Sequence, residues 1–206
     1  MATEQIQVLP LCLIMVMGPQ IMTAIFLVTS RDAVKNSLAL IAAVGLAATL
    51  SVLVWTVLVR AIDIQPDESG GPTTLDYVIS AGLALLAIRT WMTRGTAETP
   101  KWMGALEEAQ PRRAFSLGFL LIFLMPTDIA AVIAMAHYLD GASLDWYDGW
   151  PLVAGTVLLM ALPFLAYALL GHRARAAMPG VRDWLTSHGW LVNIVVLVYF
   201  IYQLIG

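Results

Sequence analysis

One acidic residue, Asp128, lies deep inside an apolar segment of the sequence. The stretch from Phe119 to Leu139 reads FLLIFLMPTDIAAVIAMAHYL, with Pro126, Thr127 and Asp128 near its centre. A charged carboxylate at the centre of a bilayer costs roughly 2.5 to 3.5 kcal/mol on insertion scales, so Asp128 should face the protein interior or bind a proton. Two roles remain open. In the functional role, Asp128 couples transport to a proton or cation, or binds a substrate amine. In the structural role, it caps a helix or forms a hydrogen bond between helices.

Two prolines interrupt apolar segments at corresponding places. Aligning Pro19 with Pro126 sets MGPQIMTAIF beside LMPTDIAAVI. Proline has no backbone N–H and clashes with the carbonyl group four residues earlier, so each helix should break there. The freed carbonyl groups need protein, water or a ligand as partners inside a bilayer. Kinked but continuous helices are the alternative.

The polar residues near these breaks predict a substrate or coupling site at mid-membrane. With Asn193 of the last apolar segment, its predicted members are Pro19, Gln20, Thr23, Pro126, Thr127, Asp128 and Asn193. A second group, Arg89, Arg112 and Arg113, is expected at an inner gate where it would contact anionic groups. For Arg89, snorkelling to the membrane surface is the alternative.

The composition is typical of a protein that works in lipid. Of 206 residues, 60% are hydrophobic and 12% are charged, whereas soluble domains are about a quarter charged. The mean hydropathy is +0.81. A single cysteine, Cys12, excludes an intramolecular disulfide and a cysteine-based zinc cluster. The histidines show no metal-ligand spacing, so we expect neither a metal nor a cofactor.

Six apolar segments are long enough to cross a bilayer, which takes about 20 residues. They run over about 6–29, 37–59, 75–93, 114–139, 150–171 and 184–205. With three spans in each half, the second half enters the membrane from the opposite side. The predicted fold is therefore an all-α integral membrane protein with six transmembrane helices in two inverted three-helix repeats, in which helices 1 and 4 are interrupted by proline. We expect a single transmembrane domain over 1–206, with repeat 1 at about 1–95, a connecting loop at about 94–113 and repeat 2 at about 114–206.

The basic residues set the predicted orientation, because short cytoplasmic loops carry an excess of lysine and arginine. Of the 11 lysine and arginine residues, all but Arg60 fall in or beside the first, third and fifth connections. We therefore expect a multi-pass protein of the plasma membrane with both termini extracytoplasmic.

These features resemble a known family. Two three-helix halves, with MGPQIMTAIF in the first helix and FSLGFLLIFLMPTDIAAVI in the fourth, are similar to the lysine-exporter (LysE) superfamily and, within it, to the GAP family of glycolipid-addressing, Sap-like proteins. The likeness covers most of the chain at the level of topology and is motif-specific around Gly18, Pro19, Gly118 and Pro126. It implies export or translocation of amino acids, small solutes or amphiphilic lipids, driven by the proton motive force.

The first functional hypothesis is a secondary transporter, exporter or translocator of a small solute or an amphiphilic lipid. Its substrate would bind between helices 1 and 4, with proton coupling through Asp128. The alternative is a non-transporting membrane assembly factor for lipid or glycolipid export. We expect membrane lipids and a small-molecule or lipid substrate as partners, and no nucleic acid; a homo-oligomer remains open.

Two further classes of function are disfavoured by the residues present. An intramembrane aspartyl protease needs two deep aspartates, and only Asp128 qualifies, so we expect no enzyme. Thiol electron transfer of the CcdA type needs a cysteine in both helix 1 and helix 4, and the position equivalent to Cys12 is Phe119.

Overall fold

The computed structural model describes residues 8–16, 19–62, 74–93 and 110–205, and every regular element in these ranges is a helix. In chain order they are α2 (Val8–Val16), α3 (Pro19–Thr29), α4 (Ala33–Ile62), α5 (Thr74–Met92), α7 (Pro111–Leu124), α8 (Pro126–Gly141), the 3-10 helix η1 (Trp146–Gly149), α9 (Trp150–Leu170) and α10 (His172–Ile205). The all-α class is confirmed for this part of the chain. Gly18 and most of the predicted connecting loop lie outside the described residues.

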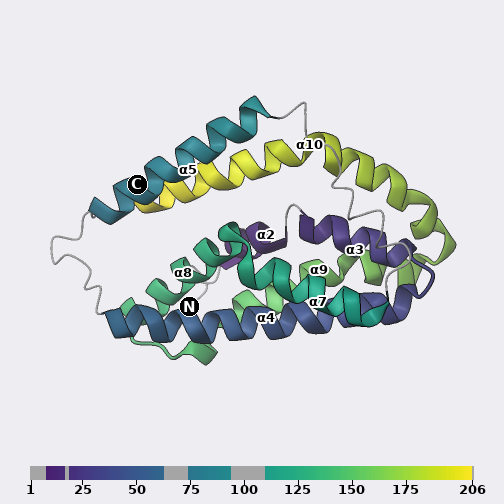
Figure 1. Cartoon of the computed structure of the whole chain (residues 1–206), viewed down its shortest axis with the longest axis horizontal. Coiled ribbons are helices and arrows are strands. Elements are labelled where there is room, and N and C mark those ends of the chain that lie inside the picture. Colours follow the sequence, from purple (N-terminus) through teal and green to yellow (C-terminus); the bar gives the residue numbers. More distant parts are fainter. Residues whose placement is uncertain (1–7, 17–18, 63–73, 94–109, 206) are drawn as a thin grey trace.

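The helices lie side by side along one long axis. In Figure 1, α4 runs from right to left, α5 returns to the right, and α10 runs to the left again. α2, α3, α4, α7, α8 and α9 form one body, and α5 packs along α10 beside it. Within the body, α4 contacts both α7 and α8, while α9 contacts both α2 and α3.

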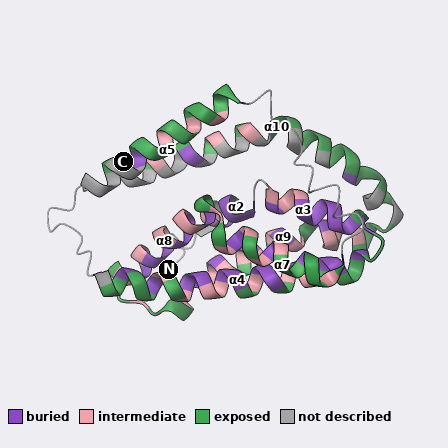
Figure 2. Cartoon of the chain, viewed as in Figure 1, coloured by how far each residue is buried: buried purple, intermediate pink, exposed green. Residues whose placement is uncertain are grey.

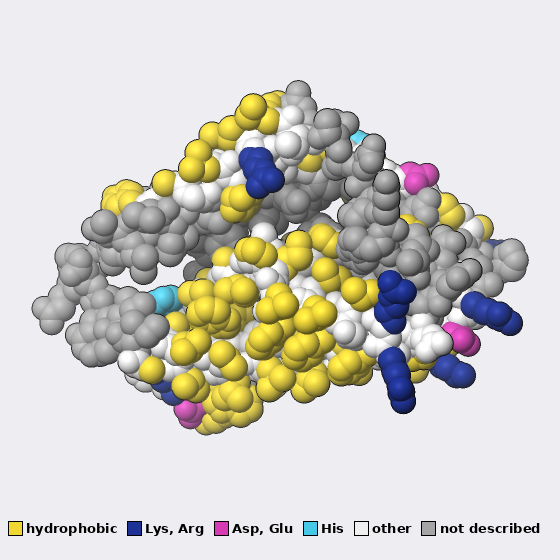
Figure 3. Space-filling model, viewed as in Figure 1, with side chains coloured by type: hydrophobic (Ala, Val, Ile, Leu, Met, Phe, Trp, Pro, Cys, Tyr) yellow, Lys and Arg dark blue, Asp and Glu magenta, His cyan; other side chains and the backbone are white. Residues whose placement is uncertain are grey.

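The body has an apolar core and an apolar outer surface. Fully buried side chains lie between the helices, and Figure 2 shows exposed positions on their outward faces. The largest buried apolar side chains include Met15, Leu27, Leu40, Ile122 and Leu139. Figure 3 shows hydrophobic side chains covering much of the visible face of the body. Soluble monomers rarely expose so extensive an apolar surface, and lipid is the environment that it suits.

Two helical segments have the length and apolarity of a membrane span, Ala33–Ala61 and Trp146–Leu170. α7 and α8 together form a third candidate, bent by 59° at the break between them. The described part of the chain thus holds two or three candidate spans. The half-helices α2 and α3, with 9 and 11 residues, are each too short to span alone. The count of six spans therefore stays a prediction.

The last helix is longer than the sequence predicted. A span was expected from Trp184, with Arg173 in the loop before it, but α10 already begins at His172. Alanine and arginine are good helix formers, and HRARAA directly follows Gly171, whose φ of 54° turns the chain after α9. Pro179 lies inside α10, which curves over this part in Figure 1. The connection between α9 and α10 is accordingly reduced to one glycine.

Two glycines allow close contact between the halves of the chain. A Cβ atom on Gly118 of α7 would lie 2.6 Å from Leu40 Cδ1 of α4. A Cβ atom on Gly155 of α9 would lie 2.5 Å from Cys12 Sγ of α2. Small residues at such crossings let helices pack by van der Waals contact, which drives their association in lipid.

We predict that Gly155→Ala lowers the free energy of unfolding by about 1–3 kcal/mol, because the added methyl group collides with Cys12 Sγ. Thermal unfolding of the purified protein in detergent measures the effect. Cys12→Ala/Gly155→Ala should recover most of the loss, since it removes the sulfur. Gly82→Ala is the control, as its Cβ would meet nothing within 4 Å. Equal stability of Gly155→Ala and Gly82→Ala would contradict the prediction.

Candidate coupling site at the helix breaks

The break between α7 and α8 is made by a single residue, Met125. Its φ of −72° and ψ of 128° are extended, because the ring of the following proline disfavours a helical conformation. Pro126 then occupies the first position of α8, where a helix has no internal partner for an N–H group. The proline at this position therefore ends one helix and starts the next, as the sequence predicted.

The first apolar segment also contains two helices, and residues 17 and 18 between them lie outside the described part of the structure. α2 ends at Val16 and α3 begins at Pro19, so a proline heads both restarted helices. Gln20 is the second residue of α3 and Asp128 the third residue of α8. Each restarted helix thus carries a polar side chain in its first turn.

A hydrogen bond between Gln20 and Asp128 joins the two restarted helices. Gln20 Nε2 donates to Asp128 Oδ2 over 2.9 Å, although the residues are 108 positions apart in the sequence. Both residues are 0% exposed, and most of the buried side chains around them in the body are apolar. The structure thus brings together two residues of the predicted site.

The other oxygen of Asp128 lies beside Thr127. Thr127 Oγ1 is 3.4 Å from Asp128 Oδ1, which is long for a hydroxyl hydrogen bond. The Thr127 side chain is exposed, whereas Asp128 is buried. A carboxylate here would accept a hydrogen bond from Gln20 and lie in the first turn of α8, where the helix N-terminus favours negative charge. The apolar surroundings oppose that charge.

Gln20 has one group that the described residues do not satisfy. Its Oε1 atom is buried without a hydrogen-bond partner among them, a situation that costs on the order of 1–3 kcal/mol. Protonation of Asp128 offers a partner: after the amide turns over, the acid O–H can donate to Oε1. The Gln20 amide therefore has a hydrogen-bonding arrangement for each protonation state of Asp128.

Helix capping by Asp128, one of the roles left open by the sequence, is wrong. The N-cap residue of α8 is Met125, and no side chain caps this helix. The extended residue required before Pro126 takes the N-cap position, which places Asp128 two residues inside the helix after the proline. The other structural role expected from the sequence, a hydrogen bond between helices, is present as the bond with Gln20.

The remaining predicted members of the site lie in different settings. Thr23 is buried, and its hydroxyl donates to Pro19 O over 2.7 Å, so it satisfies a backbone group in its own helix. Pro19 is half-buried and Pro126 is exposed. Asn193 lies in α10, but its side chain is outside the described part of the structure.

The three arginines expected at an inner gate are all exposed. Arg89 is in the last turn of α5, and Arg112 and Arg113 are in the first turn of α7. These positions at helix ends suit contact with water or lipid head groups. Their role in a gate stays a prediction.

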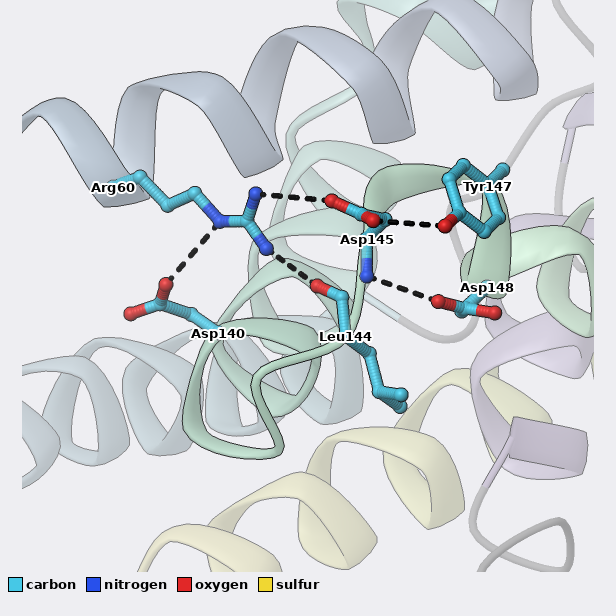
Figure 4. Close-up of polar contacts among 6 residues, drawn as sticks. All are labelled: Arg60, Asp140, Leu144, Asp145, Tyr147 and Asp148. Atoms are coloured by element: carbon cyan, nitrogen blue, oxygen red, sulfur yellow. Dashed lines mark hydrogen bonds and ion pairs between the residues drawn. The ribbon is translucent and has the colours of Figure 1, made fainter.

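A polar cluster around Arg60, in the last turn of α4, was not predicted from the sequence. Arg60 Nε lies 3.4 Å from Asp140 Oδ1, and Nη1 lies 3.6 Å from Asp145 Oδ1. Arg60 Nη2 also donates to the carbonyl oxygen of Leu144 (Figure 4). The sequence signal was the isolation of Arg60 among acidic residues, but the pairing depends on tertiary structure.

Comparison with known proteins identifies one family. The model of the family described as Sap, sulfolipid-1-addressing protein, matches residues 8–206. No curated protein and no solved structure matches the chain. The expected likeness to Sap-like proteins is confirmed, while membership of the lysine-exporter superfamily stays a prediction.

We predict that Gln20→Leu and Asp128→Leu each lower the free energy of unfolding by about 1–3 kcal/mol, because each leaves a buried polar partner unsatisfied. The double variant leaves neither partner, so its loss should be smaller than the sum of the single losses. Unfolding in detergent micelles measures all three. Strictly additive losses would contradict the pairing of the two side chains.

Proposed function

Because the chain belongs to the Sap, sulfolipid-1-addressing protein family, we propose that it acts in lipid export as a proton-coupled translocator of an amphiphilic lipid or a small solute. The observation that carries this proposal is the fully buried Gln20–Asp128 hydrogen bond at two helix breaks. The family description, which names the addressing of a sulfolipid, favours a lipid as the cargo. An ionisable group inside a membrane domain is by default a candidate for the transport pathway.

The proposed architecture is six spans in two inverted repeats, as in the lysine-exporter superfamily. Exchanging the halves converts α2 into α7, α3 into α8, α4 into α9 and α5 into α10. This exchange predicts that contacts occur in matched pairs. The contact between α4 and α7 is matched by the contact between α9 and α2, and the contact between α2 and α8 is matched by the contact between α7 and α3. Broken helices at matching positions of inverted halves are typical of a transporter's central site, and this supports a substrate position between α2–α3 and α7–α8.

Protonation of Asp128 would select between two arrangements of the halves. When Asp128 is charged, the apolar core disfavours its burial, so an arrangement that admits water to the breaks gains in population. When Asp128 is protonated, that cost disappears and the closed packing with Gln20 is favoured. The extended residue Met125 lies at the 59° bend and supplies a place where α7 and α8 can change their angle.

The distribution of charge supports a cytoplasmic end and an extracytoplasmic end. Lysine and arginine side chains gather at one end of the body, where Figure 3 shows them on the right. Exposed residues near the helix ends there include Arg31, Lys35, Arg112, Arg113 and Arg173. By the positive-inside rule, this end would face the cytoplasm. The C-terminal end of α10 lies in the other half of the view in Figure 1, which supports extracytoplasmic termini in a plasma-membrane protein.

The assembly-factor hypothesis assigns the same hydrogen bond a different purpose. In that case Gln20 and Asp128 hold the body together, and a partner protein moves the lipid. Asparagine can accept the same hydrogen bond as aspartate but cannot titrate. Replacement of Asp128 by asparagine therefore separates the two functions.

We predict that Asp128→Asn abolishes movement driven by a pH gradient while the protein remains folded. Purified protein in liposomes, a short-chain fluorescent anionic lipid as the probe, and an entrapped pH dye measure lipid movement and proton flux together. Asp32→Asn, which neutralises an exposed residue, should behave like the unmodified protein. Undiminished gradient-driven lipid movement in Asp128→Asn would overturn proton coupling. Absence of any movement by the unmodified protein would favour the assembly factor.

A further inference from the structure

A short segment packs beside Arg60: residues 140–149, here called the lid, which comprise the end of α8, the following turn and η1. Arg60, in the last turn of α4, extends toward the lid (Figure 4). The Arg60 guanidinium contacts Asp140, Leu144 and Asp145, so one side chain contacts the lid at three of its residues.

Internal contacts make the lid a single unit. Asp145 and Asp148 form a reciprocal capping box at the start of η1, in which each side chain accepts a hydrogen bond from the backbone N–H of the other. The Asp145 N–H donates to Asp148 Oδ2 over 2.9 Å, and the Tyr147 hydroxyl donates to Asp145 Oδ2 over 2.8 Å. Asp145 is therefore linked by hydrogen bonds to two residues of η1, so a displacement of Asp145 should also displace this 3-10 helix.

The lid packs directly on the core of the body. A Cβ atom on Gly149 would lie 2.8 Å from Val52 Cγ1 and 3.4 Å from Leu139 Cδ1, so the lid backbone rests on core side chains without a side chain between them. One turn further along α9, the carbonyl oxygen of Leu152 accepts a hydrogen bond from the Cys12 thiol over 3.6 Å. Cys12 is 1% exposed and lies in α2, so this hydrogen bond places it three residues along α9 from the end of the lid.

We propose that Arg60, Asp140 and Asp145 form a latch that closes this end of the body and opens when their ion pairs break. The side chains of these three residues are 40%, 38% and 52% exposed. Exposed ion pairs stabilise only weakly and are screened by salt, which suits a contact that must break and re-form. The latch supplies the proposed translocator with a gate, and the gate can be tested without any transport measurement.

Cys12 provides the readout because it is the only cysteine of the chain. In a lipid nanodisc, a charged maleimide reagent reaches both aqueous ends of the protein but not the lipid-facing surface. We expect slow labelling of Cys12 in the unmodified protein. Arg60→Gln should increase the labelling rate about three- to tenfold, as expected for the loss of two exposed ion pairs and one hydrogen bond.

Two further variants separate opening of the latch from general damage. Asp140→Asn/Asp145→Asn removes both ion pairs but keeps side chains that can cap η1, and it should raise the labelling rate as Arg60→Gln does. Arg31→Gln, which neutralises an exposed arginine on another connection, should leave the rate unchanged. The unfolding temperatures of all variants are measured alongside, so that a globally destabilised variant is recognised.

Salt provides an independent arm of the test. Raising the ionic strength from about 0.15 M to 1 M shortens the Debye length from about 8 to 3 Å, which should speed labelling of the unmodified protein but not of Arg60→Gln. Unchanged labelling in both latch variants, or an equal salt effect with and without Arg60, would overturn the latch. Failure of proton coupling at Asp128 would leave these labelling results unaltered.

Discussion

The hydrogen bond between Gln20 and Asp128 constrains the arrangement of the whole body. It forms only if two proline-headed helices begin beside each other, with the second residue of one facing the third residue of the other. The continuous helices α4 and α9 lie against these broken helices. Their close approach depends on Gly118 and Gly155, where a side chain would collide with Leu40 and Cys12. Backbone geometry, helix packing and the polar pair therefore support one another.

The two ends of the body differ in charge, and this difference favours one orientation of the molecule across a membrane. One end carries exposed lysine and arginine residues at the starts of helices. At the other end, Arg60 is surrounded by Asp140 and Asp145 and holds a short lid over the core. A buried titratable group between a basic end and a latched acidic end is an arrangement that suits alternating access. Breaking surface ion pairs costs little free energy, whereas charging the buried carboxylate costs more.

The parts predicted correctly from the sequence are those governed by local rules. The break at Pro126 follows from the restriction that proline imposes on the residue before it, and the burial of Asp128 follows from the cost of placing a carboxylate in hydrocarbon. The early start of α10 was missed, because HRARAA has the charge of a loop but also the propensity of a helix. The lid contacts of Arg60 were missed because its partners are 80 or more residues away and share no sequence pattern with it. Capping by Asp128 was also expected from a local rule, the preference for aspartate at the N-cap. The residue before Pro126 is extended instead, so Met125 occupies the N-cap position.

Infrared difference spectroscopy between acidic and alkaline samples tests the central claim most directly, because it observes the carboxylic acid itself. We predict a carbonyl stretching band of a protonated buried carboxylic acid that is absent in Asp128→Asn. We also predict that its frequency shifts in Gln20→Leu, where the hydrogen-bond partner is removed. A band that persists in Asp128→Asn, or one that Gln20→Leu leaves unchanged, would contradict a titrating Asp128 held by Gln20 at the meeting point of the two broken helices.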